Sequence, residues 1–275
     1  HGGHIGPNLG MVEATIALHY VFNSPVDKIV YDVSHQSYAH KMLTGRKDAF
    51  LHAEEYDEVT GYTNPQESKH DFFTIGHTST SVSLACGLAK ARDLKRGREN
   101  IIAVIGDGSL SGGEAYEGLS NAGETGTNLI VVVNDNEMSI AENHGGLYQN
   151  LKALRDSDGQ TPCNFFKSLG LDYIYVKDGN DITALIHAFT QVKDIPRPVV
   201  VHIHTLKGKG YTLAETYKER FHWGMPFNLE TGQPLSDGGE HGRLLQFDRK
   251  IPAGANAKRP YRGGYFLGNT RGNRF

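Results

Sequence analysis

The sequence predicts an α/β fold in which a parallel β-sheet is covered by helices on both faces. Two segments are apolar throughout, IIAVI at 101–105 and LIVVV at 129–133. Segments with a helical spacing of apolar residues precede and follow them. Short strands that are apolar on both faces and alternate with helices are typical of parallel sheets buried between two helical layers.

The first elements follow this alternation. Residues 10–22 place apolar side chains near a helical period and predict an amphipathic helix. Residues 29–33 (IVYDV) form a β-branched and aromatic run, which predicts a buried strand. Residues 79–95 are rich in Ala and Leu and turn polar at their end, as expected for a helix packed on a sheet.

The alternation continues after the strand at 101–105. Residues 112–124 predict a helix, and residues 129–133 predict the next strand. After this strand we expect a polar loop, followed by two short apolar segments at 165–169 and 173–176. A helix over 182–192 and a strand over 199–204 complete the pattern, so residues 1–235 are assigned to one domain.

The last forty residues have a different character. Residues 236–275 contain eight glycines, eight Lys or Arg and three acids, so their net charge is +5. Apolar periodicity is lost here, which predicts a flexible Gly- and Arg-rich tail or an end that is not native coding sequence.

Composition narrows the function classes. Hydrophobic residues make up 38% and charged residues 21% of 275 residues, which is typical of a soluble globular protein. The net charge of −3 gives no reason to expect nucleic acid or an anionic membrane as a partner. No apolar run approaches the ~20 residues of a membrane span. Cys86 and Cys163 form no CxxC or zinc spacing, so we expect reduced thiols in a cytoplasmic protein.

The strongest chemical signal lies at two strand ends, IGDGSLSGG at 105–113 and VNDNEMSI at 133–140. Asp107 and Asn136 are 29 residues apart, about one strand–helix–strand crossover, so both side chains can reach the same edge of the sheet. Carboxylate and amide oxygens suit Mg²⁺. Gly106 and Gly108 allow the backbone to approach a diphosphate, and the following helix offers free N–H groups.

Two other interpretations of this pattern are open. Asp, Asn and Gly are common turn residues, so the two motifs could be ordinary strand-end turns. A dinucleotide fingerprint would need glycine at position 111, where Ser111 stands. Histidines in several Gly-rich or turn segments favour catalysis instead, because neutral imidazoles can donate to phosphate or hydroxyl oxygens and relay protons. These histidines are His4, His35, His40, His77 and His222.

The GDG motif followed some thirty residues later by an Asn-containing turn resembles the thiamine diphosphate motif of transketolase-type enzymes. That resemblance implies that Asp107 and Asn136 bind the metal through their side chains and Met138 through its carbonyl. Longer segments resemble the N-terminal part of the 1-deoxy-D-xylulose-5-phosphate synthase family over about residues 1–230. They are GGHIGPNLGMVEATIALHYVFNSPVDKIVYDVSHQSYAHKMLTGR, GHTSTSVSLACGLAKARDL, VIGDGSLSGGEAYEGLSNAG, LIVVVNDNEMSIAEN and KGKGYTLAE.

The family resemblance implies thiamine diphosphate and Mg²⁺ as cofactors in the diphosphate-binding domain of the thiamine diphosphate fold. It implies that His4, His35 and His222 line the reaction site. It implies cofactor contacts from His35, Gly76, His77, Thr78, Gly108, Ser109, Asn136 and Tyr211. Lys207 and Lys209 are candidate phosphate contacts, and solvated surface lysines are the equal alternative.

The implied reaction condenses pyruvate with glyceraldehyde 3-phosphate and releases CO₂, a step of isoprenoid biosynthesis, in an enzyme that is a homodimer. In the family, a glutamate of a pyrimidine-binding domain assists the cofactor. Nothing after Leu235 resembles that domain, so we expect it from a second chain or a further part of the protein. Two alternatives are the N-terminal subunit of a split transketolase acting on sugar phosphates and a non-catalytic cofactor-binding fragment.

Two positions depart from the family pattern. Ser34 stands where the GHQ segment commonly has glycine, and residues 143–164 are much shorter than in well-known bacterial synthases. The short segment favours the transketolase alternative, whereas GGHIGPNLG and SHQSYAHK favour the synthase.

Overall fold

A computed structural model describes residues 2–235, and the prediction for 236–275 lies outside these residues. Five strands form one wholly parallel sheet in the order β1-β2-β3-β5-β4. Their bounds are β1 Lys28–Tyr31, β2 Ile101–Gly106, β3 Leu129–Asp135, β4 Asp172–Val176 and β5 Pro198–His204. The predicted α/β class with a parallel sheet is confirmed.

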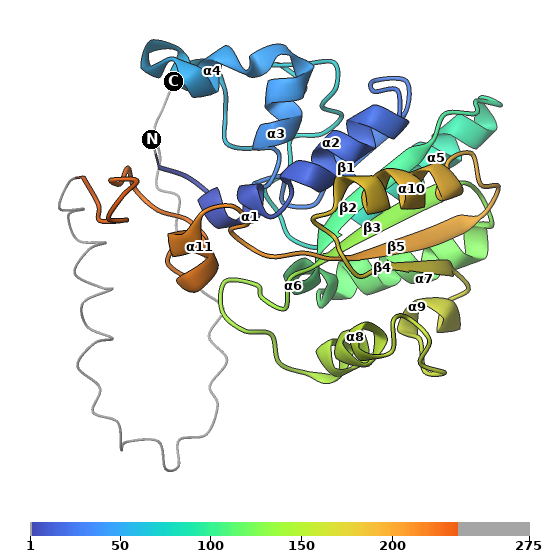
Figure 1. Ribbon diagram of the computed structural model, residues 1–275. Helices are drawn as coiled ribbons and strands as arrows, with labels where there is room; N and C mark the ends of the chain where they lie inside the picture. Colours follow the sequence, from blue (N-terminus) through green and yellow to red (C-terminus); the bar gives the residue numbers. More distant parts are fainter. Residues whose placement is uncertain (1, 236–275) are drawn as a thin grey trace.

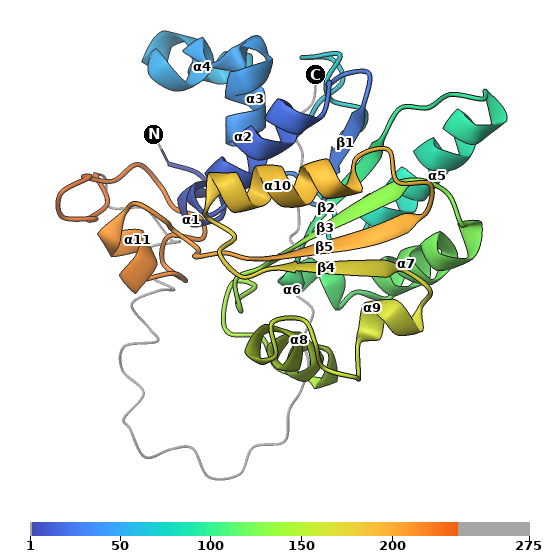
Figure 2. The ribbon, with the colours of Figure 1, turned by 45° about the vertical axis from the view of Figure 1, so that its right-hand side comes forward.

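Helices cover both faces of the sheet (Figures 1 and 2). One face packs against α2 (Val12–Val21) and α10 (Ile182–Val192). The other packs against α5 (Ser81–Leu94), α7 (Gly113–Thr125), α8 (Gly146–Asp156) and α9 (Phe165–Ser168). Shorter helices are α1 (Ile5–Leu9), α3 (Tyr38–Lys41), α4 (Asp48–Leu51), α6 (Asp107–Leu110) and α11 (Thr212–Thr216). Met42–Arg46 and Ala53–Glu58 form π-type and 3₁₀ turns.

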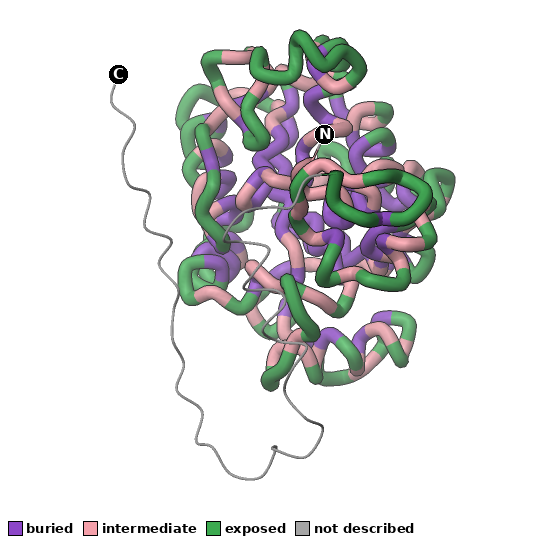
Figure 3. The backbone as a smooth tube through the Cα atoms, turned by 90° about the vertical axis from the view of Figure 1, so that its left-hand side faces the viewer, coloured by how far each residue is buried: buried purple, intermediate pink, exposed green. Residues whose placement is uncertain are grey.

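The central strands are apolar on both sides because each side enters a separate core. In β2, Ile102 and Val104 face the α2–α10 layer, whereas Ile101 and Ile105 face the α5–α7 layer. Alternate side chains of a strand point to opposite faces, so a strand covered on both faces has no polar position. Figure 3 shows the buried residues concentrated in the interior of the molecule and the exposed residues at its periphery. Among residues 2–235, no helix combines the length and the apolar character needed to cross a membrane.

Helix α8 corrects the prediction of a polar loop after β3. It spans Gly146–Asp156, and only Leu151 and Leu154 of its residues are fully buried. Most of its surface faces solvent, so its polar composition hides the helix. The signal that could have revealed it is the i, i+4, i+7 spacing of Leu147, Leu151 and Leu154, which places these leucines on one helical face.

Candidate cofactor and active site

The carboxyl ends of β2 and β3 bring the two sequence motifs together. Gly106 of β2 is in register with Asn134 of β3, so Asp107 and Asp135 follow these paired residues side by side. A cavity of about 180 Å³ opens at this edge. Its lining includes most of the predicted site: His4, His35, Thr78, Asp107, Gly108, Ser109, Asn136, Met138 and His222. Ligands of open parallel sheets bind at this edge.

Asp107 is a buried carboxylate of the site. Its side chain accepts hydrogen bonds from the Gly108 N–H at 3.0 Å and from the Asn143 amide at 2.8 Å. Burial, and then the nearby carboxylate of Asp135, raise the pKa of Asp107 well above its usual range. An ionised Asp107 is therefore unfavourable here unless a cation lies beside it.

Asn136 and Met138 follow β3 and also line the cavity. The Asn136 side-chain oxygen accepts a hydrogen bond from the Met138 N–H at 3.2 Å. Across residues 2–235, no three His, Cys, Asp or Glu side chains are grouped to hold a metal. A cation beside Asp107 would thus depend on amide, carbonyl and cofactor oxygens, which fits Mg²⁺ better than zinc.

Three histidines that are far apart in sequence meet at the other side of the cavity. Their ring centroids are 4.8 Å apart for His4 and His35, 5.7 Å for His4 and His222, and 5.5 Å for His35 and His222. His40 and His77 lie elsewhere: His40 is bonded to Asp71, and His77 is exposed. The structure thus brings together the three histidines predicted to line the reaction site.

The N-terminal segment is joined to the segment after α11, and this join places the histidines. Gly3 and Gly224 exchange two backbone hydrogen bonds, and Gly6 donates to the Phe221 carbonyl. A side chain at Gly2 would meet the Gly224 oxygen at 2.2 Å, so the two backbones can approach only without it. The Asn8 amide then donates to the carbonyls of both His4 and His35 at 2.7 Å.

The three imidazoles are neutral near pH 7. Burial lowers the pKa of His4 to about 4, of His35 to about 3 and of His222 to about 4. Repulsion from Lys207 and from the protonated forms of the neighbouring imidazoles lowers the pKa of His35 and of His222 further. The buried Nδ1 of His35 has no hydrogen-bond partner, and neither has Oε1 of its neighbour Gln36 in the cavity wall. Such unpaired buried atoms are costly unless a ligand completes them, which fits a polar cofactor or substrate.

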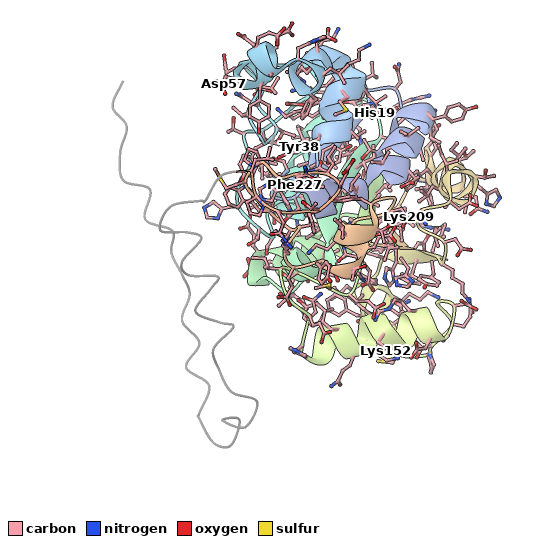
Figure 4. All side chains as sticks on the ribbon, turned by 60° about the vertical axis from the view of Figure 1, so that its left-hand side comes forward. His19, Tyr38, Asp57, Lys152, Lys209 and Phe227 are labelled. Carbon is pink, nitrogen blue, oxygen red and sulfur yellow. The ribbon has the colours of Figure 1, made fainter. Side chains whose placement is uncertain are left out.

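Lys207 is a cavity residue, so the surface-lysine alternative is wrong for it. Its side chain is 1% exposed, and its ammonium donates to the Ser139 carbonyl at 2.6 Å and to His222 Nδ1 at 3.0 Å. An ammonium group has no acceptor, so His222 carries its proton on Nε2. Burial lowers the pKa of Lys207 to about 8, which leaves it mostly charged at neutral pH. Lys209, labelled in Figure 4, is exposed.

The neutral histidines lead to a prediction for proton binding. Because the folded state binds these protons less tightly than the unfolded chain, the free energy of unfolding should fall as the pH drops from about 6.5 towards 4. In Lys207→Met, the midpoints of His222 and His35 should rise, since a nearby positive charge is removed. NMR titration of the imidazole carbon-bound protons measures both midpoints. Unchanged midpoints in Lys207→Met would contradict the contact.

Some site residues were not predicted from the sequence. Asp32 lines the cavity, and its two oxygens accept from the N–H groups of Ser79 and Ser81. Ser79 also donates from Oγ to the Ser109 carbonyl at 2.7 Å, which fixes the turn after Asp107. The available signal was an Asp at a strand end together with the serines at the start of a later helix. It is weak, because the hydrogen-bond partners of Asp32, Ser79 and Ser81, lie far from it in the sequence.

Ser34 has a backbone conformation that favours glycine. Its φ is +70°, a left-handed conformation that disfavours side chains. The side chain offsets this cost by donating to the Ile75 carbonyl at 3.0 Å and accepting from the Thr63 N–H at 2.9 Å. The departure from the family pattern is therefore compensated locally.

Three predicted cofactor contacts do not line the cavity. Gly76 and His77 are exposed and precede the lining residue Thr78. Tyr211 donates from its hydroxyl to the Leu229 carbonyl and stacks on Phe227. Gly108 lines the cavity, but a side chain there would meet Ser139 at 2.7 Å. The absence of a side chain therefore also allows the GDG motif to pack against the segment after β3.

The fold is similar to that of solved transketolases. The transketolase of Leishmania mexicana superposes with a TM-score of 0.62 at 22% identity, covering 77% of this chain and 34% of that one. The Campylobacter jejuni transketolase gives a TM-score of 0.60 at 22% identity, covering 79% and 36%. At such low sequence identity, these similarities support the fold of this chain and no functional assignment.

Sequence comparison defines the family. Residues 1–161 and 157–205 match the family model described as 1-deoxy-D-xylulose-5-phosphate synthase. The synthase of Caldanaerobacter subterraneus is 42% identical over 86% of this chain, and that of Symbiobacterium thermophilum 44% identical over 85%. The chain belongs to the 1-deoxy-D-xylulose-5-phosphate synthase family. It spans less than half the length of these relatives, 44% and 42% respectively.

Proposed function

We propose that this chain supplies the diphosphate- and Mg²⁺-binding part of a thiamine diphosphate-dependent transferase. The reaction condenses pyruvate with glyceraldehyde 3-phosphate to 1-deoxy-D-xylulose 5-phosphate and releases CO₂. One observation carries the proposal: three neutral histidines and a buried lysine line the same cavity as the Asp107–Asn136 pair. Metal-ligand chemistry and proton-handling groups thus face one small space.

The sheet edge would hold the diphosphate end of the cofactor. Asp107 and Asn136 would bind Mg²⁺ through side-chain oxygens and Met138 through its carbonyl. Thr78, Gly108 and Ser109 would contact the diphosphate from the same cavity lining. A divalent cation would relieve the unfavourable charge of buried Asp107, which explains why the site holds a carboxylate with a raised pKa.

The histidine side would bind the reacting parts of the substrates. Thiamine diphosphate, when bound, supplies a carbon nucleophile and an electron sink for decarboxylation. His4, His35 and His222 would donate hydrogen bonds to carbonyl and hydroxyl oxygens, because each is neutral and retains one N–H. The Lys207 charge would attract the carboxylate of pyruvate or the phosphate of the aldehyde. Gly76, His77 and Tyr211 remain predicted contacts that would require the bound cofactor to extend beyond the present lining.

A second wall would complete the site. The cavity of about 180 Å³ is smaller than the ~300–1,000 Å³ of small-molecule sites. We infer that a pyrimidine-binding domain, on a second chain or a further part of the protein, closes over it. Homodimer formation and a cytoplasmic location belong to the same proposal, and the unpaired Cys86 and Cys163 are compatible with that location.

Calorimetry on the 275-residue chain tests the proposal. We expect thiamine diphosphate to bind with Mg²⁺ and not after chelation, because the diphosphate and Asp107 repel each other without a cation. We expect modest affinity, since the cavity of about 180 Å³ would contact only part of the cofactor. Equal affinity with and without metal would reject the assignment. Binding of a sugar phosphate in preference to pyruvate would favour the split-transketolase alternative, and inactivity with any completing domain would favour the non-catalytic one.

A further inference from the structure

The turn that carries two of the proposed metal ligands has an unfavourable backbone. Glu137 lies between Asn136 and Met138, and its φ is +68°. Residues other than glycine rarely adopt this left-handed backbone conformation, and it persists where surrounding contacts hold it in place. The conformation of Glu137 therefore sets the course of the chain between Asn136 and Met138, which both line the cavity. The question is which contacts hold it.

Four contacts hold Glu137. Its N–H donates to Asp135 at 3.1 Å, and its carbonyl accepts from the Asn143 N–H at 3.4 Å. Its carboxylate lies 3.2 Å from an Arg155 nitrogen and 3.1 Å from His204 Nε2. Arg155 and His204 come from α8 and β5, so the turn is tied to two separate elements.

Arg155 also holds the residue at the base of the turn. Its guanidinium pairs with the buried carboxylate of Asp135 while it reaches Glu137 with its other nitrogen. Asp135 is fixed from behind by His202 Nε2 at 2.9 Å, and His202 Nδ1 meets the Tyr173 hydroxyl at 2.7 Å. The guanidinium of Arg155 thus bridges the two acids on either side of Asn136.

Helix α8 also controls the far end of the loop. Asn143, three residues before α8 begins, donates to Asp107 at 2.8 Å. Figures 1 and 2 show α8 below the sheet, joined by this loop to β3. The loop is therefore anchored at its start through Arg155 and at its end through Asn143, and the Asn136–Met138 turn lies between these anchors.

We propose that Arg155 is a positioning residue for the divalent cation. By bridging Asp135 and Glu137, it holds the left-handed turn that places Asn136 and Met138 in the lining of the cavity of Asp107. This inference rests on the proposed cofactor site. The direction of the change in cation affinity distinguishes positioning from electrostatics. Removing a positive charge near the site would by itself strengthen cation binding, whereas losing the turn weakens it.

Mn²⁺ binding to the full chain with saturating thiamine diphosphate, followed by EPR, tests this proposal. Arg155→Met should weaken Mn²⁺ binding by about tenfold or more, the usual effect of removing a partner behind a metal ligand. Arg155→Lys should lie between, because it keeps the charge without the two-pronged bridge. The control is Lys152→Met, an exposed residue of α8 paired with Asp156 (Figure 4), for which we expect a change of less than about twofold.

Glu137→Gly supplies the decisive comparison. Glycine adopts φ +68° without being held, so Arg155→Met should cost less than about threefold in the Glu137→Gly background. Wild-type or tighter Mn²⁺ binding in Arg155→Met would overturn the proposal. If that variant does not fold, unchanged binding in Arg155→Lys would overturn it equally. Absence of Mn²⁺ binding by the wild-type chain would instead reject the proposed cofactor site, and this inference with it.

Discussion

Asp107→Ala should abolish Mg²⁺-dependent binding of thiamine diphosphate. It should not cause a large loss in the free energy of unfolding of the cation-free protein. The carboxylate is buried beside Asp135, and without a cation its ionised form is unfavourable. Because its folded pKa lies above the unfolded value, ionised Asp107 lowers stability at neutral pH, and the effect disappears as the pH falls below the unfolded value. Asp107→Asn, which keeps the volume and removes the charge, should therefore raise the melting temperature of the cation-free chain.

Calorimetry and thermal unfolding on the same samples measure the two effects. We expect at least about a hundredfold loss of cofactor affinity in both Asp107 variants, because the metal loses a direct ligand. Glu114→Ala is the matched control, an exposed acid on α7 seven residues further along. Retained Mg²⁺-dependent binding in Asp107→Ala would place the metal elsewhere. A large loss of stability in Asp107→Asn would show that the carboxylate is a structural group.

The 275-residue chain alone should not decarboxylate pyruvate at a measurable rate. The cofactor's carbon acid is weak, and the family's remedy is a carboxylic acid beside the aminopyrimidine ring. Among the described residues that line the cavity, the carboxyl groups are those of Asp32 and Asp107. Asp32 accepts two backbone N–H groups, and Asp107 lies at the proposed metal end. Neither is free to serve the pyrimidine.

Addition of a pyrimidine-binding polypeptide should restore turnover. We expect a gain of about 100-fold or more, the usual range for a general acid–base group. Release of labelled CO₂ from pyruvate, with and without glyceraldehyde 3-phosphate, measures it. The Asp107→Ala chain in the same mixture is the control for cofactor binding. Metal- and cofactor-dependent turnover by the chain alone would show that it already contains the assisting acid.

The fold class was predictable because the strands carry their own signal. Segments such as 101–105 and 129–133 are apolar at every position, and only a strand covered on both faces tolerates this. The proximity of Asp107 and Asn136 was predictable for the same reason, since consecutive parallel strands place their carboxyl ends at one edge. Helix α8 was missed because its polar surface left three leucines as its only pattern.

The sequence by itself determined the parallel sheet, the paired strand-end motifs and the family, since each depends on local composition or on residues one crossover apart. Tertiary structure alone decided what depends on distant contacts. It joined Gly3 to Gly224, which set His4 beside His222. It also buried Lys207 against Ser139 and brought Arg155 under the Asn136 turn. Such contacts link segments up to about 220 residues apart, and their stability arises from packing that no local pattern encodes.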